Sequence, residues 1–247
     1  MQILKAECVR KSFGGLTAVN DVDFDVEQGE IMGLIGPNGA GKTTFFNLIS
    51  GAYQVDSGTI MFNSTRISGR TPHQICRLGI GRTFQTAKNF PGMSVRENAV
   101  MGALFGKRGK TRGEAEREVD QILEFVGLAD KSGRHVPDLT LAGQKRVEVA
   151  RALATKPTLL MLDETMAGLN PTEIEEAMDL VRNIRDSGIT IIMIEHVMRA
   201  IMCICDRIVV LHHGAKIAAG TPEEISTNSA VVEVYLGASD GIGCKLC

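Results

Sequence analysis

The sequence contains no long apolar stretch. No run approaches the roughly 18 consecutive apolar residues that a membrane-spanning helix requires, so no transmembrane helix is expected. Residues Met1 to Arg10 alternate apolar with polar side chains and have no signal-peptide core. The chain is therefore expected to be made and kept in the cytosol, and a role at a membrane would require partner proteins.

An excess of charge of either sign is also absent. The formal net charge is -2, which gives no reason to expect nucleic-acid binding as a main activity. The hydrophobic share of 44% and the charged share of 23% are ordinary for a soluble globular chain. A length of 247 residues allows one large α/β domain or two small lobes, and no internal repeat or low-complexity tract is visible.

A second cysteine pair at zinc-ligand spacing is lacking as well. Cys244 and Cys247 form a lone C-x-x-C that could bind a metal or cycle as a disulfide, but without a second pair a frayed tail is favoured. Reduced thiols are the default in the cytosol. The six cysteines are Cys8, Cys76, Cys203, Cys205, Cys244 and Cys247.

What the sequence does contain is a phosphate-binding loop. The pattern G-x-x-x-x-G-K-[ST] is met by Gly36, Pro37, Asn38, Gly39, Ala40, Gly41, Lys42 and Thr43. An apolar run at 31–35 precedes it as a predicted buried strand, and Thr44 begins a predicted helix at 44–49. Glycines let successive N–H groups face an anion, Lys42 supplies charge for the β- and γ-phosphates, and Thr43 supplies a hydroxyl for Mg²⁺. The chain is expected to bind a nucleoside triphosphate.

The first part of the chain is predicted to form strands, and the middle is predicted to be largely helical. Alternating side chains predict antiparallel strands at 3–9 and 18–26 around Gly14 and Gly15, with a further strand at 58–62. From about 71 to 136 the apolar spacing becomes helical. The basic run at 107–112 is interpreted as a solvated loop, with a lipid or RNA contact as the less favoured alternative.

After residue 157, strands alternate with helices. Such alternation implies parallel pairing and a doubly wound core. Asn170, Pro171 and Glu173 form a helix start, and Thr221 to Glu224 form another. The predicted elements are strands at 158–162 and 189–194, a helix at 197–205, and a hairpin of 207–211 with 216–219.

A second motif ends the first of these strands. Four apolar residues, 159–162, are followed by Asp163 and Glu164, at the strand end where ligands bind in open α/β sheets. Asp163 can hold Mg²⁺ or its waters, and Glu164 is placed to orient an attacking water or accept its proton. The alternative is that the two acids only cap a strand. Because a phosphate-binding loop lies in the same chain, the functional interpretation is favoured.

Gln85 and His196 each follow a predicted strand. Gln85 comes after 79–84, and His196 comes after the strand at 191–194 and one acid, Glu195. Both would reach the same sheet edge as the phosphate-binding loop. Alone each is a weak signal, since such residues are usually a surface glutamine and a structural histidine.

Together these motifs resemble the nucleotide-binding subunit of an ATP-binding cassette (ABC) transporter over nearly the whole chain. The resemblance implies a P-loop NTPase fold of class α/β, with a RecA-like core, an antiparallel β subdomain and a helical subdomain in a single domain, 1–247. Residues 1–70 and 158–247 would form the core with the β subdomain, and about 71–157 the helical lobe.

The same resemblance implies roles for single residues. Gly36 to Thr43, with Thr44, would be the Walker A nucleotide site. Asp163 would be the Walker B acid, with Lys42, Glu164 and His196 catalytic, and Thr43, Gln85 and Asp163 around Mg²⁺. Phe13 falls where the family places an aromatic ring against adenine, although a core residue at a strand end is the alternative.

Residues 140–144 align with the family's signature loop, which contacts the γ-phosphate held by the other subunit. The aligned residues are Thr140, Leu141, Ala142, Gly143 and Gln144, leading into a predicted helix at 145–154. Leu141 stands where serine is usual and cannot donate a hydroxyl. Backbone N–H groups at Ala142 and Gly143, or the Thr140 hydroxyl after a small register change, are the possible substitutes. Thr165 and Asn170 replace the usual proline and aspartate nearby.

Within the family, several stretches resemble the ATP-binding subunit of branched-chain amino-acid importers. They are 13–19, 47–51, 167–171 and 220–225. Urea and amide importers share much of this pattern and remain an alternative. The resemblance implies ATP and Mg²⁺ as cofactors. The implied partners are a second ABC ATPase subunit, permease subunits and, indirectly, a solute-binding protein, but no nucleic acid. The implied location is the cytoplasmic, inner face of the membrane.

Other functions are less well supported by the sequence. A soluble ABC-type ATPase of translation or DNA repair would usually carry two cassettes or a long coiled-coil insertion, which are not visible. A P-loop kinase would not need His196 or the signature-like loop. A regulatory nucleotide-binding module with little turnover is disfavoured because the residues expected for hydrolysis are all present.

Overall fold

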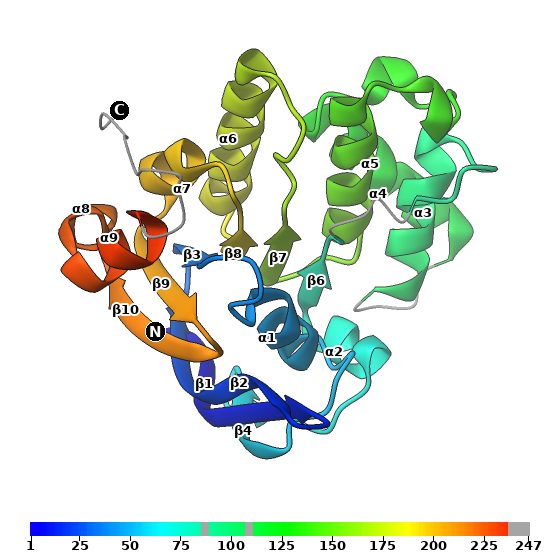
Figure 1. The fold of residues 1–247 in the computed structure, drawn as a ribbon. Helices are drawn as coiled ribbons and strands as arrows, with labels where there is room; N and C mark the ends of the chain where they lie inside the picture. The colour runs from blue at the N-terminus through cyan, green and yellow to red at the C-terminus, as the bar shows by residue number, and fades with distance from the viewer. Residues whose placement is uncertain (85–88, 107–110, 237–247) are drawn as a thin grey trace.

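The computed structural model describes residues 1–84, 89–106 and 111–236, which fold into two sheets and their covering helices (Figure 1). Gln85, the first four residues of the basic run (107–110) and the C-x-x-C at 244–247 lie outside the described residues. In chain order the elements are β1 (Gln2–Phe13), β2 (Leu16–Glu27), β3 (Ile31–Ile35), α1 (Lys42–Ile49), β4 (Ser57–Phe62), β5 (Thr65–Arg66), α2 (Pro72–Leu78), β6 (Ile80–Arg82), α3 (Val95–Phe105), α4 (Arg112–Phe125), η1 (Ala129–Lys131), η2 (Val136–Asp138), α5 (Leu141–Ala154), β7 (Leu159–Asp163), α6 (Pro171–Asp186), β8 (Thr190–Ile194), α7 (Met198–Ile204), β9 (Arg207–His212), β10 (Ala215–Gly220), α8 (Pro222–Thr227) and α9 (Ser229–Leu236).

The larger sheet has the strand order β10-β9-β3-β8-β7-β6, and all its pairs are parallel except β9 with β10. Its central strands β3, β7 and β8 are buried throughout and largely apolar because both faces are covered. Along β3, Met32 and Leu34 face one hydrophobic core, and Ile31 and Ile35 face the other. The predicted doubly wound core is confirmed, and parallel pairing brings the carboxyl ends of β3, β7 and β8 to one edge.

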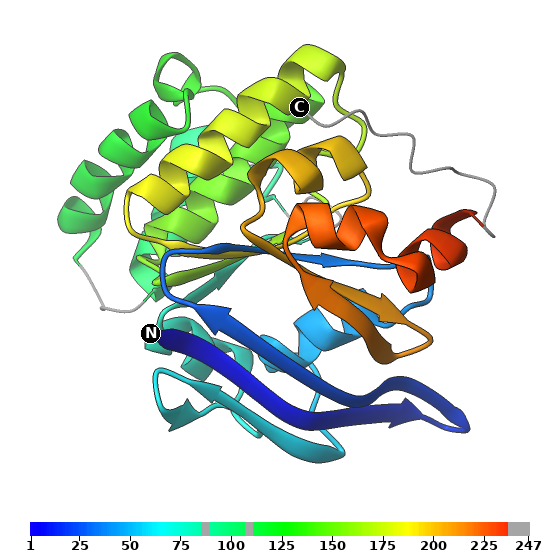
Figure 2. The same ribbon diagram turned by 90° about the vertical axis from the view of Figure 1, so that its left-hand side faces the viewer.

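The smaller sheet is antiparallel, with the order β2-β1-β4-β5. Its first hairpin turns at Gly14 and Gly15, as predicted, but β1 and β2 are each 12 residues long, longer than the ranges expected from alternation. Helix α1 lies between the two sheets, and α6 and α7 cover the opposite face of the larger one (Figures 1 and 2). Phe45 and Phe46 of α1 are fully buried in this layer. The first helix is thereby held rigidly behind the loop that precedes it.

The segment 71–157 is not wholly helical. It begins with α2 and β6, and β6 pairs with β7 in the larger sheet, whereas α3, α4 and α5 pack on one another as a helical lobe that shares a hydrophobic core with that sheet. Figure 1 shows these three helices packed together beside the sheet. The predicted strand at 79–84 is confirmed as β6, although shorter. The capping boxes predicted at Asn170 and Thr221 are both present.

Candidate functional site

The loop between β3 and α1 requires glycine for steric reasons. Gly36 and Gly41 have φ of 149° and 100°. A Cβ at Gly36 would lie 2.1 Å from the carbonyl oxygen of Leu211, and one at Gly41 would lie 2.3 Å from that of Ala18. These close approaches let the backbone curl between a buried strand and a helix N-terminus, where only glycine fits.

Lys42 is buried at the start of α1. Its Nζ donates hydrogen bonds to the carbonyl oxygens of Gly36 at 2.7 Å and Pro37 at 3.0 Å. Burial lowers the pKa of Lys42, while the nearby charges of Glu164 and Asp163 oppose that shift. The ammonium group therefore rests against its own loop, at a position from which a phosphate oxygen could take over its hydrogen bonds.

A cleft of about 420 Å³ opens over this loop. Its wall includes residues 38–44 together with Phe13, Glu164, His196 and His213. Phe13 ends β1 with 44% exposure and makes an edge-on contact with Tyr53 at 5.2 Å between ring centres. The alternative of a core residue is therefore wrong for Phe13, whose exposed ring borders the cleft.

Asp163 ends β7 with its side chain 1% exposed. Its Oδ2 accepts a hydrogen bond of 3.0 Å from Nη2 of Arg82, whose Nη1 donates to Asn47 and Ser50 on and after α1. Burial raises the pKa of Asp163, and the charges of Arg82 and Lys42 oppose this. Oδ1 of Asp163 is buried and has no hydrogen-bond partner among the described residues. One carboxylate oxygen is thus held by the protein and the other is left for a ligand.

Glu164 and His196 follow the neighbouring strands β7 and β8. Nε2 of His196 lies 2.9 Å from Oε1 of Glu164, within hydrogen-bond distance. Glu164 has a φ of 52°, in the left-handed region that is strained for a residue with a Cβ. The structure therefore brings together Lys42, Asp163, Glu164 and His196, which the sequence placed at one sheet edge.

The signature residues lie apart from this cleft, and none of 140–144 is among the described residues that line it. Helix α5 begins at Leu141, so the expectation of a loop leading to a helix at 145 is wrong. Oγ1 of Thr140 caps the helix by accepting from the N–H of Gly143 at 3.2 Å. Leu141 is 45% exposed. Nε2 of Gln144 donates to the carbonyl oxygen of Leu139 at 3.1 Å.

Three polar residues near the site were not singled out from the sequence. Arg82 holds Asp163, Lys145 donates from Nζ to the carbonyl oxygen of Glu164 at 2.7 Å, and Glu195 is buried beside residues 165–166. Each pairing joins positions at least 19 residues apart, so no local pattern marks it. For Glu195, the sequence offered one signal, which was its position between a predicted strand and His196.

A family model described as "ABC transporter" matches residues 19–167, which is more than half of the chain. The chain belongs to the ABC transporter family. A further model, "Branched-chain amino acid ATP-binding cassette transporter", matches residues 215–241. This ABC ATPase is 42% identical over 239 residues to the high-affinity branched-chain amino acid transport ATP-binding protein LivG of Salmonella typhimurium, covering 91% of this chain and 94% of the relative. The corresponding protein BraF of Pseudomonas aeruginosa is 39% identical over 249 residues, with 95% and 98% covered.

Solved structures agree with this assignment. The ADP conformation of MJ1267, an ATP-binding cassette of an ABC transporter, superposes with a TM-score of 0.89 at 31% identity and covers 96% of this chain and 99% of that one. A nucleotide-free cassette from an ABC transporter gives a TM-score of 0.87 at 30% identity, with 95% and 99% covered. The fold predicted for the ABC ATPase is confirmed. Among its described residues, no helix combines the length and apolar character needed to cross a bilayer.

Proposed function

We propose that this ABC ATPase hydrolyses ATP to power a membrane importer of branched-chain amino acids. The observation that carries the proposal is the cleft in which the phosphate-binding loop, Glu164 and His196 meet. The substrate class rests on the names of the relatives LivG and BraF and on the matched segment at 215–241. Binding of the adenine ring by the exposed Phe13 is part of the proposal.

Hydrolysis would use the charges already placed around the loop. Lys42 and backbone N–H groups of the loop would stabilise negative charge on the transferred phosphoryl group. Glu164 would orient the attacking water or accept its proton, and His196 would support the γ-phosphate from its position beside Glu164. Because Lys42 needs only to exchange carbonyl partners for phosphate oxygens, the site requires little rearrangement to bind ATP.

The residues at the cleft fit Mg²⁺. Oδ1 of Asp163 is a buried carboxylate oxygen with no partner among the described residues, and oxygen atoms are the ligands that Mg²⁺ prefers. Asp163 and the exposed hydroxyl of Thr43 would hold the ion, together with Gln85 in the proposal. When bound, Mg²⁺ neutralises charge on the phosphate oxygens. Arg82 would keep Asp163 oriented toward it.

A second ATPase subunit, identical or related, would complete the site. We propose that Thr140, not Leu141, takes the place of the family's serine, since its hydroxyl stands at the exposed N-terminus of α5. The helix N-terminus attracts an anion, here the γ-phosphate held by the other subunit. Gly143 and Gln144 would stay near that phosphate as part of the first turn.

Permease subunits would dock in a second, apolar cavity of about 600 Å³ that lies between α2, β6 and the helical lobe. Phe84, Phe90 and Phe105 line it and are 37%, 42% and 67% exposed. Exposed aromatic side chains around a hollow are typical of protein interfaces. Docking there would hold the ATPase on the cytoplasmic, inner face of the membrane, and a solute-binding protein would act through the permease.

The test is solute uptake by cells of the source organism in which Glu164→Gln replaces the wild-type chain. We expect uptake of radiolabelled leucine, isoleucine and valine to be lost, while uptake of urea and acetamide is retained. Loss of urea or amide uptake with normal leucine uptake would overturn the assignment in favour of a urea or amide importer. Glu223→Gln, an exposed carboxylate on α8, is the matched control and should transport normally.

A further inference from the structure

The backbone that presents Glu164 is strained and is held from both sides. A left-handed φ in a residue with a Cβ is strained and persists only where the surroundings determine it. The N–H of Glu164 donates to the carbonyl oxygen of Ile194 at 2.9 Å, a bond that continues the pairing of β7 with β8. The other side of Glu164, its carbonyl group and the residues after it, has no strand to pair with.

Besides a backbone hydrogen bond of 3.4 Å from the N–H of Ala167 to the carbonyl oxygen of Glu164, two side chains from different parts of the fold hold that other side. Nζ of Lys145, in the first turn of α5, donates to the carbonyl oxygen of Glu164 at 2.7 Å. Oε1 of Glu195 accepts from the N–H of Met166 at 2.8 Å and from Oγ1 of Thr165 at 3.1 Å. A proline at position 165 would lack this hydroxyl. The Thr165 side chain therefore adds a second hydrogen bond to the one that Glu195 accepts from Met166.

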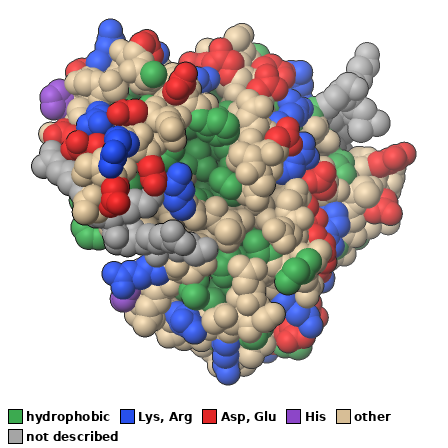
Figure 3. Space-filling model, turned by 180° about the vertical axis from the view of Figure 1, so that it is seen from behind, with side chains coloured by type: hydrophobic (Ala, Val, Ile, Leu, Met, Phe, Trp, Pro, Cys, Tyr) green, Lys and Arg blue, Asp and Glu red, His purple; other side chains and the backbone are tan. Residues whose placement is uncertain are grey.

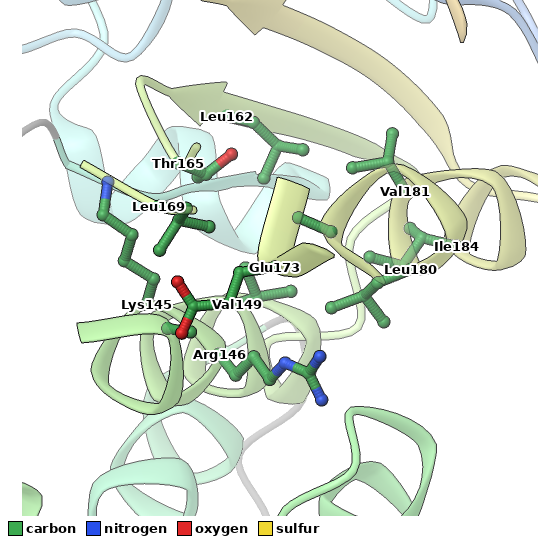
Figure 4. A pocket seen from close by; sticks show the side chains of 12 residues that line it. Lys145, Arg146, Val149, Leu162, Thr165, Leu169, Glu173, Leu180, Val181 and Ile184 are labelled. Carbon is green, nitrogen blue, oxygen red and sulfur yellow. The ribbon is translucent and has the colours of Figure 1, made fainter. Parts of the chain in front are cut away.

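The contact through Lys145 crosses between the two parts of the molecule. Helix α5 packs on α3 and α4 in the helical lobe, whereas Glu164 directly follows strand β7 of the larger sheet. A hollow with hydrophobic side chains separates α5 from α6 on the face shown in Figure 3, and the close-up in Figure 4 shows Lys145 extending from α5 toward the segment that carries Thr165. A cavity of about 30 Å³ remains there, beside side chains of α5 and α6 that otherwise pack in one hydrophobic cluster.

The same helix also borders the apolar cavity proposed for the permease. Arg151 and Ala152 on α5 line that cavity, one to two turns beyond Lys145. At a rise of 1.5 Å per residue, the two ends of this path lie about 10 Å apart along one rigid helix. If docking at the apolar cavity shifted α5, the ammonium group of Lys145 would therefore move relative to the carbonyl oxygen of Glu164.

From these contacts we infer that Lys145 and Glu195 are positioning residues that set the backbone of the catalytic acid, and that Lys145 makes turnover depend on the placement of α5. The inference rests on the proposed hydrolytic role of Glu164. Neither side chain is among the described residues that line the nucleotide cleft. Removing either contact should therefore slow the chemical step and leave ATP binding unchanged.

The first experiment measures steady-state phosphate release by the full chain with Lys145→Met, which keeps the length of the side chain and removes its donor. A misplacement of the catalytic group by about 1 Å can cost roughly a hundredfold in rate, so we expect kcat to fall by about ten- to a hundredfold. The KM for ATP should change by less than about twofold. Lys145→Arg restores a donor and should recover most of the rate. Lys216→Met, at an exposed lysine on β10, is the matched control and should behave as wild type.

The second experiment tests Glu195 in the same assay. Glu195→Gln keeps an oxygen that can accept from Met166 and Thr165 and should retain most of kcat, whereas Glu195→Leu removes the acceptor and should lose it. Wild-type kcat in Lys145→Met or in Glu195→Leu would overturn the inference, as would a rise in KM with kcat unchanged. If Glu195→Leu does not fold, the Lys145 variants decide. Glu164→Gln is measured in parallel: full turnover in that variant would defeat the proposed function itself, whereas its loss beside an active Lys145→Met defeats only this inference.

Discussion

Nη2 of Arg82 donates a hydrogen bond of 3.0 Å to Oδ2 of Asp163, and the two side chains are 9% and 1% exposed. The same guanidinium donates to Asn47 and Ser50, so it joins the helix after the phosphate-binding loop to the strand that carries the acids. A buried pair of this kind is costly to break, because removing one partner leaves the other charge without compensation. The pair therefore links stability to the geometry of the nucleotide site.

Arg82→Met should destabilise the fold by about 3–5 kcal/mol, because Asp163 would stay buried without its cation. The measurement is urea-induced unfolding at neutral pH, compared with Arg10→Met. Arg10 pairs with Asp21 at 3.5 Å where both side chains are exposed, and its loss should cost no more than about 1 kcal/mol. Equal unfolding midpoints for the two variants would contradict this account of the buried pair.

Glu164→Gln should reduce phosphate release at least about a hundredfold while leaving ATP binding intact, since it removes only the carboxylate proposed to activate the water. His196→Ala should also reduce turnover. Because the two side chains lie 2.9 Å apart and act as a unit, the double variant should be little slower than the worse single one. The measurements are steady-state phosphate release and binding of a fluorescent ATP analogue. A wild-type chain that binds ATP but releases almost no phosphate would instead indicate the regulatory module.

Local patterns were sufficient for most of the fold and for the parts of the site that follow strands. A buried apolar run followed by a turn or an acid specifies both the strand and its functional end, which is why Lys42, Asp163, Glu164 and His196 could be placed together. Residues paired across the fold could not be found in this way. Arg82 with Asp163 spans 81 positions, and nothing in either local sequence requires the other.

The start of α5 shows a different limit of sequence reasoning. The first turn contains no acid, and its residues Leu141, Ala142 and Gly143 carry no capping pattern beyond Thr140 itself. The alignment with a signature loop therefore suggested a loop where the chain is already helical. Recognising Thr140 as the N-cap required the backbone, because the hydrogen bond from Gly143 shows where the helix begins.

Glu195 should make stability fall as pH rises through the neutral range. Burial raises the pKa of Glu195 from 4.5 to about 7, against the opposing effects of Met166, Thr165 and Lys145, and the nearby Glu164 raises it further. A carboxyl group whose pKa is higher in the folded state carries no ionisation penalty below pH 4.5, accumulates one between 4.5 and about 7, and bears all of it above 7. The penalty is at most about 3 kcal/mol.

Glu195→Gln removes that ionisation. The unfolding free energy of the wild type, measured relative to this variant between pH 5 and pH 8, should therefore decline with pH. The measurement is chemical unfolding of both proteins at several pH values in one buffer series. Every other titrating group is common to the two proteins. If their unfolding free energies change with pH in parallel, Glu195 is not buried as a carboxylic acid. Glu223→Gln, on the surface of α8, controls for the loss of one charge.

Thr140 should be required for ATP-dependent pairing of two subunits. In a Glu164→Gln background, which prevents hydrolysis, light scattering with MgATP should show a dimer, and without nucleotide a monomer. Thr140→Val removes both the hydroxyl offered to the γ-phosphate and the helix cap, which is worth about 1 kcal/mol. It should abolish the dimer. Thr140→Ser keeps both functions and should dimerise, as should Leu141→Ala, because the exposed Leu141 side chain has no polar group to offer.

The control separates recognition of the phosphate from loss of the helix. The comparison is Thr221→Val, which removes the N-cap of α8 in the same way. If Thr140→Val loses the dimer but lowers the thermal midpoint no more than Thr221→Val, the Thr140 hydroxyl acts in the nucleotide site. If Leu141→Ala loses the dimer and Thr140→Val keeps it, the register proposed for the signature is wrong. If no variant dimerises, including the Glu164→Gln parent with its intact Thr140, the partner must be a related chain. Titration with that second ATPase subunit should then restore the dimer only in chains that keep a hydroxyl at position 140.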